Sequence, residues 1–277
     1  MKERLEIIHQ SSKEERDYIL EYQSIDISTR PKLNLAGVEF ENVSRDKAIA
    51  IILDLIKKKE KFHHILLLDP IKLDLMLPGR PLHRITKKAS MILPSASGLG
   101  WAAKKFSLEF EEIITPISLI IDLIRISEKQ GLTLFFLGGT EKAIEKLFFN
   151  LTKHFPKIRI VGRHSGKLSK ERELMVKEAI RKTSPDIIFL GFDFPYQEIW
   201  IENNNAYLGK SIVIGIWNNL DTLAGKSDST PEYFRKRNLT WLWKVISRPW
   251  NLKQIFITLH FYFYFLFLGL KHKKEDK

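Results

Sequence analysis

The chain has 277 residues, of which 44% are hydrophobic and 28% are charged, and its formal net charge is +12. That balance is typical of a globular protein and excludes a disordered or collagen-like chain. Cysteine is absent, which excludes a disulfide scaffold, a thiolate zinc site, an iron–sulfur cluster and a cysteine nucleophile.

In chain order, residues 1–33 form a polar extension without the apolar stretch of a secretory signal. The absence of cysteine fits a reducing cytoplasm, where the protein is expected. Apolar runs predict strands at 64–69, 90–94, 132–138, 158–162, 186–191 and 211–216. Amphipathic runs predict helices at 46–59, 117–130, 141–155 and 170–183. Strands that are apolar throughout are covered on both faces. The sequence therefore predicts an α/β core over residues 34–228, with a mostly parallel sheet between two helix layers.

Ligands of such sheets bind at the carboxyl ends of the strands. Gly138, Gly139 and Thr140 follow a predicted strand and open a predicted helix. Two glycines let a phosphate approach the backbone, and a helix N-terminus favours an anion. A tight turn without a ligand explains the same residues equally well, because the full G-x-G-x-x-G pattern is absent.

A second polar group follows the strand at 186–191. Asp193, Gln197 and Glu198 stand there beside Pro195, which stiffens the loop. An amide and a carboxylate at this place are suited to a sugar hydroxyl or a uracil edge. The alternative is that Gln197 and Glu198 only cap a helix.

Other catalytic patterns are absent from the sequence. The histidines, including His63 and His64, lack the spacing of metal ligands. Neither Ser97 nor Ser165 has a recognisable triad partner. No metal site is expected, and a serine hydrolase is not supported.

The C-terminal segment 229–277 is predicted as a basic and aromatic helical appendage. From Arg235 to Lys277 there are ten Lys or Arg and two acidic residues, so residues 235–277 carry 10 − 2 = +8. The uncharged run 255–270 spans roughly 24 Å as a helix, less than the ~30 Å hydrocarbon core of a bilayer. An interfacial helix on an anionic membrane is favoured over an oligomer interface or a packed terminal helix.

Several blocks of sequence resemble the WecB/TagA/CpsF family of glycosyltransferases. They are LNLAGVEFENVSRDKAI (33–49), SGLGWAAK (97–104), FFLGGTEKAIEKL (135–147), FPKIRIVGRHSGKL (155–168), SPDIIFLGFDFPYQEIWI (184–201), IGIWNNLDTLAGK (214–226) and TPEYFRKRNLTWLWKVISRPWN (230–251). Their order and spacing make the resemblance more specific than any single motif.

The resemblance implies a Rossmann-like, inverting enzyme without a bound metal or other cofactor. Its donor would be a UDP-linked amino sugar such as N-acetylmannosamine, and its acceptor a sugar on a polyprenyl diphosphate. The expected place is the inner face of the cell membrane, and the products would serve polysaccharide or teichoic-acid synthesis. A homo-oligomer is possible in such a family, whereas a nucleic-acid partner is not expected because no recognition motif is present.

The residues of the acceptor side depart from the family pattern. Ser97-Gly98 stands where the family has its D-G with the proposed general base, and Leu67-Leu68-Asp69 stands where it has T-x-N. A serine without a partner does not accept the proton of the attacking hydroxyl. Asp69 is the hypothetical replacement base, with Asp193 a less favoured alternative.

The donor side matches the family at Gly138, Gly139, Pro195, Gln197 and Glu198. The first hypothesis is therefore a membrane-associated UDP-sugar transferase, and the second is a non-catalytic nucleotide-sugar-binding homologue or scaffold. In the first, four basic residues would meet either the acceptor diphosphate or lipid: Arg235, Lys236, Arg237 and Arg248.

Overall fold

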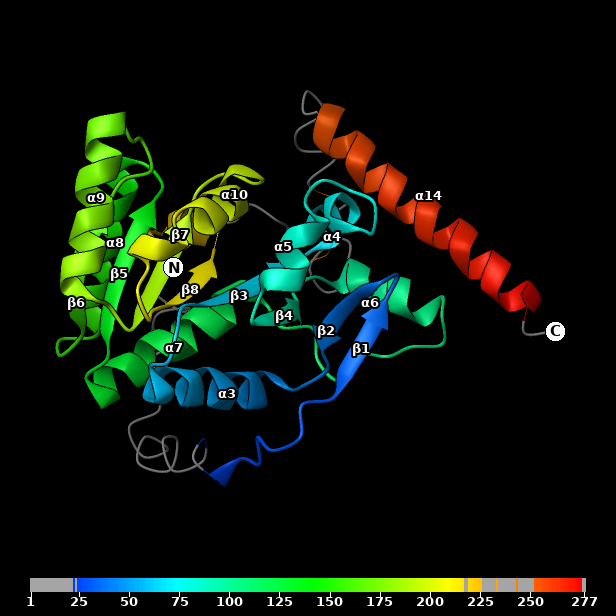
Figure 1. The fold of residues 1–277 in the computed structure, drawn as a ribbon, viewed down its shortest axis with the longest axis horizontal. Coiled ribbons are helices and arrows are strands. Elements are labelled where there is room, and N and C mark those ends of the chain that lie inside the picture. The colour runs from blue at the N-terminus through cyan, green and yellow to red at the C-terminus, as the bar shows by residue number, and fades with distance from the viewer. Residues whose placement is uncertain are drawn as a thin grey trace. The chain divides into compact units, whose positions relative to one another are not determined.

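A six-stranded sheet, mostly parallel, organises the protein (Figure 1). The computed structural model describes Tyr22, residues 24–216, 219–225, Tyr233, Trp243 and residues 252–275. The strand order is β4-β3-β8-β7-β5-β6. The strands are β3 His63–Leu68, β4 Met91–Pro94, β5 Thr133–Gly138, β6 Arg159–His164, β7 Ile187–Gly191 and β8 Ile212–Gly215. All six strands were predicted from apolar runs, and the predicted α/β class is confirmed.

Helices connect the strands, and the four predicted ones are present as α3 Arg45–Lys58, α7 Pro116–Gln130, α8 Glu141–His154 and α9 Lys170–Thr183. Side chains of Ser44, Thr140 and Ser169 cap α3, α8 and α9 by accepting bonds from backbone N–H groups of the first turn. The remaining described helical elements are α4 Pro70–Met76, α5 His83–Lys88, α6 Ser97–Lys104, α10 Tyr196–Asn203, η1 Asn205–Tyr207, α11 Asn219–Leu223 and α14 Leu252–Glu275.

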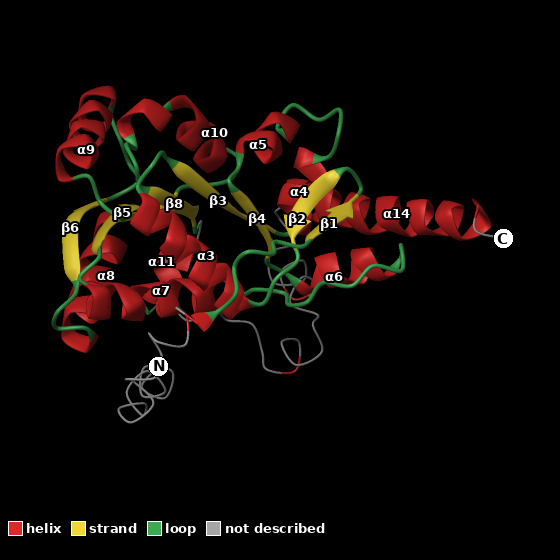
Figure 2. Cartoon of the chain, turned by 60° about the horizontal axis from the view of Figure 1, so that its bottom comes forward, coloured by secondary structure: helices red, strands yellow, loops and turns green. Residues whose placement is uncertain are grey.

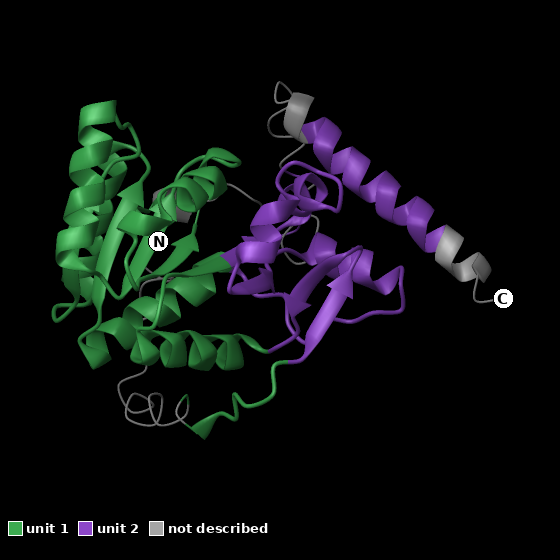
Figure 3. Ribbon diagram, in the orientation of Figure 1, with its two compact units in different colours: residues 1–30, 44–65, 116–227 green, residues 31–43, 66–115, 228–277 purple. Residues whose placement is uncertain are grey.

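The chain forms two compact units (Figure 3). Unit 1 comprises residues 1–30, 44–65 and 116–227, and unit 2 comprises residues 31–43, 66–115 and 228–277. The residues of the predicted core, 34–228, are thus divided between both units. The C-terminal helix α14 belongs to unit 2.

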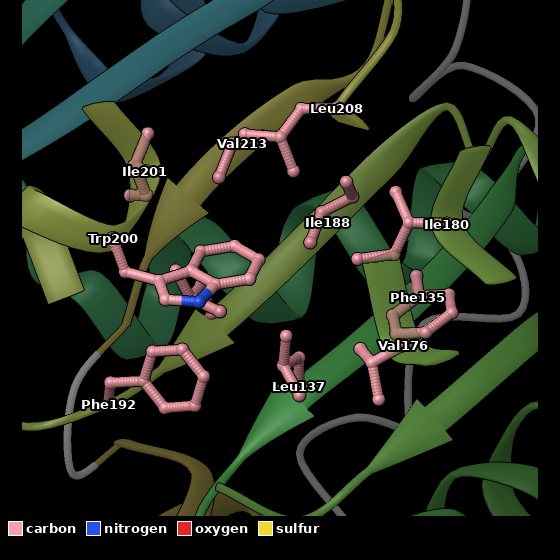
Figure 4. Packing of buried hydrophobic residues seen from close by; sticks show 11 residues of the cluster. Phe135, Leu137, Val176, Ile180, Ile188, Phe192, Trp200, Ile201, Leu208 and Val213 are labelled. Carbon is pink, nitrogen blue, oxygen red and sulfur yellow. The ribbon is translucent and has the colours of Figure 1, made fainter. Parts of the chain in front are cut away.

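Unit 1 has the layered build that its apolar strands require. Figure 2 shows α9 and α10 on one face of its strands and α3, α7, α8 and α11 on the other. On the α9–α10 side, a buried cluster joins side chains of three strands to both helices (Figure 4). Phe135 and Ile188 come from the sheet, Val176 from α9 and Trp200 from α10, all of them at most 4% exposed.

Unit 2 adds an antiparallel hairpin made of β1 Lys32–Leu35 and β2 Val38–Glu41. Ala36 and Gly37, with φ of 52° and 84°, form its two-residue turn. The inward side chains of the hairpin, such as Leu35 and Phe40, are fully buried.

The predicted helix at 255–270 is confirmed and extends over α14, Leu252–Glu275. Its buried side chains recur at helical spacing at Thr258, Phe261 and Phe265, and they pack within unit 2. Other positions expose large apolar side chains: Phe256, Leu259, Phe263, Leu266, Phe267 and Leu270. We call these six residues the outer stripe. Among the residues that the structure describes, no helix is both long and apolar enough to cross a bilayer.

Candidate functional site

In unit 1, the carboxyl ends of β5 and β7 lie side by side, with Gly138 paired to Gly191. Gly138 has a φ of 138°, and a side chain there would collide with the backbone of Gly191. Gly139 has a φ of 65°, and its N–H donates to the carbonyl of Gly191 over 3.1 Å. Both glycines therefore occupy conformations that L side chains rarely adopt, and the strand ends approach more closely than side chains would allow.

A third glycine lies against this turn, although sequence reasoning had given it no role of its own. The N–H of Gly166 donates to the carbonyl of Gly139 over 2.8 Å. A Cβ atom on Gly166 would lie 3.3 Å from the Cα of Gly138 and from the nitrogen of Gly139. Next to this bare backbone, the exposed Thr140 caps α8 by accepting from the N–H of Ala143 over 3.2 Å.

The segment after β7 divides into an exposed loop and a buried first turn of α10. Asp193 and Pro195 are exposed, and the Phe194–Pro195 peptide bond is cis. Gln197 and Glu198 are both 0% exposed, and Nε2 of Gln197 donates to Oε1 of Glu198 over 2.8 Å. Both side chains are therefore buried, although their place after the strand had suited them to contact with a sugar hydroxyl or a uracil edge.

Within unit 2, Asp69 and Ser97 follow neighbouring strands and begin neighbouring helices. Asp69 caps α4, its Oδ1 accepting from the N–H of Lys72 over 2.9 Å. Ser95 ties the two strand ends together, because its N–H and its hydroxyl both donate to the carbonyl of Leu68. The residues that follow them, Pro70 and Gly98, also lie in contact, since a Cβ on Gly98 would clash with the ring of Pro70. The two predicted acceptor-side residues are therefore brought to one edge.

Helix α14 contributes two polar side chains to unit 2 that sequence reasoning did not identify. The hydroxyl of Tyr262 lies close to Gly98, and burial raises the pKa of Tyr262 to about 12. Its ring meets that of Trp101 edge to face at 4.9 Å. Nδ1 of His260 lies 2.7 Å from Oδ1 of the buried Asp74 on α4. No sequence signal links these residues, because their partners are far away in the chain.

Four candidates, Arg235, Lys236, Arg237 and Arg248, lie outside the described residues. In the described part of the chain, no group of three or more His, Asp or Glu side chains is arranged to hold a metal ion.

Parallel strands, helices on both faces and glycine turns at the carboxyl edge place the protein in the Rossmann-like class of α/β folds. The family follows from comparison with known proteins. Residues 33–276 match the model of the glycosyl transferase WecG/TagA/CpsF family, so the chain belongs to that family.

Similar proteins include N-acetylglucosaminyldiphosphoundecaprenol N-acetyl-beta-D-mannosaminyltransferases of Staphylococcus aureus. Those of strains NCTC 8325 / PS 47 and COL are each 25% identical to this chain over 220 residues. The alignment covers 79% of this chain and 86% of each relative. The predicted family resemblance is thereby confirmed.

Proposed function

We propose that the protein transfers an amino sugar such as N-acetylmannosamine from a UDP donor to N-acetylglucosamine on a polyprenyl diphosphate. The single observation that carries this proposal is the family match over residues 33–276, which includes the candidate residues of both units. The relatives named for this reaction align with four-fifths of the chain, which supports the same class of substrates. The reaction would invert the anomeric centre, require no metal and supply the synthesis of a cell-surface polymer.

The donor diphosphate would lie at the turn of Gly138 and Gly139. Backbone without side chains, next to the capped N-terminus of α8, suits a negatively charged group. Asp193 and Pro195, which are exposed, would form the rim of this place, and the buried Gln197 and Glu198 would support it from within. This arrangement supports a role in donor binding for all four residues. Asp193 and Pro195 would contact the donor, and Gln197 and Glu198 would hold the loop in place.

The acceptor hydroxyl would lose its proton to Asp69. This carboxylate lies at the edge of the sheet, beside the element that begins with Ser97, where the family carries its proposed base. A positioned base contributes about 10²–10⁴-fold to such a transfer. Asp69 also caps α4, so replacement by alanine would remove two functions at once.

Replacement of Asp69 by asparagine separates these functions, because asparagine caps a helix as well as aspartate but accepts no proton. We expect Asp69→Asn to bind UDP normally and to lose transfer activity by about 10²-fold or more. The assay follows radiolabelled sugar from a panel of UDP-sugars into a lipid-diphosphate acceptor. Asp193→Asn tests the less favoured base, and Asp54→Asn on α3 serves as the matched control. Full activity of Asp69→Asn would assign the base elsewhere.

A second candidate function is a nucleotide-sugar-binding homologue without turnover, which the serine at position 97 favours. Both functions predict binding of UDP to the purified protein, measured by titration calorimetry. Only the first predicts hydrolysis or transfer of the donor sugar. Absence of UDP binding would contradict both.

The protein would meet its lipid-linked acceptor at the inner face of the cell membrane. The outer stripe of α14 offers apolar and aromatic side chains suited to the interfacial region of a bilayer. The basic residues of the C-terminal segment would add attraction to anionic lipid, or contact the acceptor diphosphate. Burial of the same stripe between copies of the chain is the alternative that the vesicle experiment below decides.

A further inference from the structure

A buried polar network joins the first turn of α10 to the sheet in unit 1. Its members are His64 of β3 and Gln197 and Glu198 of α10, which are 4%, 0% and 0% exposed. Nε2 of His64 lies 3.1 Å from Oε2 of Glu198, within ion-pair distance but outside the angular range of a hydrogen bond. The other carboxylate oxygen accepts from Gln197 over 2.8 Å. The carboxylate of Glu198 thus contacts both His64 of β3 and the side-chain amide of Gln197.

This network lies beside an apolar cluster. His64 is aligned with Val213 of β8, so the two side chains share one face of the sheet. Val213 belongs to the same buried cluster as Trp200 and Ile201 of α10. Burial of a carboxylate among such side chains costs several kcal/mol unless partners compensate it. Apolar side chains at both positions 64 and 198 would avoid this cost, so stability alone does not explain the pair.

The geometry connects the network to the proposed donor loop. The side-chain amide of Gln197 rests on Gly215 at the end of β8, where a Cβ atom would collide with it. The N–H of Gln197 donates to the carbonyl of Asp193 over 2.9 Å, which closes the loop that follows β7. A shift of Glu198 would therefore move Gln197 and the exposed loop residues together.

We propose that His64 is a positioning residue, which fixes Glu198 and through it the loop 193–197 that holds the UDP donor. The inference rests on the proposed function, because it assigns His64 a role in donor binding. His64 itself does not contact the donor. Its effect would be specific to the donor, and binding of the lipid-linked acceptor would not depend on it.

Three variants test this role. His64→Leu removes one partner of Glu198. We expect UDP binding to weaken about tenfold or more and the donor KM to rise, with the acceptor KM unchanged. His64→Gln keeps an N–H donor, and we expect UDP binding within about threefold of the wild type. The double variant His64→Leu/Glu198→Leu replaces the histidine–carboxylate pair by apolar groups, which typically recovers stability. We expect its Tm to recover while its affinity for UDP stays about tenfold or more below that of the wild type.

The double variant distinguishes a positioning role from a structural one, even if His64→Leu does not fold. Recovery of both Tm and UDP affinity would overturn the proposal, as would UDP binding by His64→Leu at the wild-type level or a tenfold loss in His64→Gln. His154→Leu is the matched control, because that histidine ends α8 and its Nδ1 lies 2.7 Å from the carbonyl oxygen of Asn150 in the preceding turn. Failure of the wild-type protein to bind UDP would instead contradict the proposed function.

Discussion

Gly138 ends β5 with a φ of 138°, and a side chain at this position would meet the backbone of Gly191. Backbone cannot move aside as a flexible side chain can, so Gly138→Ala would separate the ends of β5 and β7. We expect a loss of more than about 3 kcal/mol in the free energy of unfolding, since strain of the dihedral alone costs about 1–3 kcal/mol. UDP binding should be lost as well. Chemical denaturation and titration calorimetry measure the two effects.

Gly131→Ala is the matched control for this variant. Gly131 also has a positive φ, 66°, but no atom lies within 4 Å of a Cβ placed there. Its substitution should cost about 1–2 kcal/mol, the cost of a left-handed conformation, with UDP binding unchanged. Equal effects of the two variants would show that the close approach to Gly191 is unimportant.

Asp186 shows how a single carboxylate makes stability depend on pH. Burial raises its pKa, but hydrogen bonds from Lys59 and Thr133 outweigh burial, and the pKa is lowered overall. The contacts are short, 2.8 Å to Nζ of Lys59 and 2.8 Å to both the N–H and the hydroxyl of Thr133. A lowered folded-state pKa stabilises the protein above the unfolded-state value near 3.9 and ceases to do so as the pH falls through the folded-state value.

Asp186→Asn should therefore destabilise the protein by about 1–3 kcal/mol at pH 7. The difference from the wild type should shrink as the pH falls below about 4, because the unfolded-state carboxylate takes up its proton first and the folded-state carboxylate follows at lower pH. Urea unfolding at pH 7 and pH 3 measures this change. Asp54→Asn, which breaks only an i,i+4 pair with Lys58, should change stability by less than about 1 kcal/mol. A destabilisation by Asp186→Asn that is the same at both pH values would refute the linkage.

At the scale of elements, the long apolar and amphipathic runs predicted the strands and helices well. The run 132–138 became β5 at Thr133–Gly138, and 170–183 became α9 with the same bounds. Short helices were not predicted from their pattern, among them α10, which has eight residues. A helix of two turns buries its side chains according to its neighbours and shows too few repeats for a period to be recognised.

The candidate site was predictable to the extent that it follows from strand ends. The turn at Gly138 and Gly139 has the positive φ values that a glycine pair indicates. The burial of Gln197 and Glu198 could not be predicted, because it depends on His64, which a different part of the sequence supplies. Partners distant in sequence become visible only when the fold brings them together.

Helix α14 has two apolar faces with different roles, and single substitutions separate them. Phe261 and Phe265 are 0% exposed, whereas Phe263 is 69% exposed. Phe261→Ala should lower the free energy of unfolding by about 3–5 kcal/mol through loss of packing in unit 2. Phe263→Ala, the control on the same helix, should change it by less than about 0.5 kcal/mol. Equal losses in thermal or urea unfolding would show that both faces are buried in solution.

For the molecule as a whole, charge and apolar surface coincide in the C-terminal segment. Residues 235–277 carry +8 of the net charge of +12, and the outer stripe lies on the helix α14 within them. Apolar side chains at an interface gain from burial among lipids, and basic residues gain about 1 kcal/mol each near an anionic surface. Neither contribution requires a helix that spans the bilayer.

We therefore expect the full-length protein to bind vesicles that contain phosphatidylglycerol, and to bind them more weakly as salt rises. Screening shortens the electrostatic range from about 10 Å at 0.1 M salt to about 3 Å at 1 M. The triple variant Phe256→Ser/Phe263→Ser/Phe267→Ser should lose vesicle binding by more than about tenfold while keeping its Tm, since all three side chains are at least 69% exposed. Vesicle sedimentation and thermal unfolding measure these quantities.

The control for the triple variant is Phe149→Ser, which removes a side chain of similar exposure, 65%, from α8 in unit 1. It should sediment with vesicles as the wild type does, because it lies outside the basic C-terminal segment. If the triple variant binds vesicles normally but changes the oligomeric state in light scattering, the outer stripe is an interface between copies of the chain. That outcome would contradict the membrane role, since a stripe buried between subunits is not available to lipid.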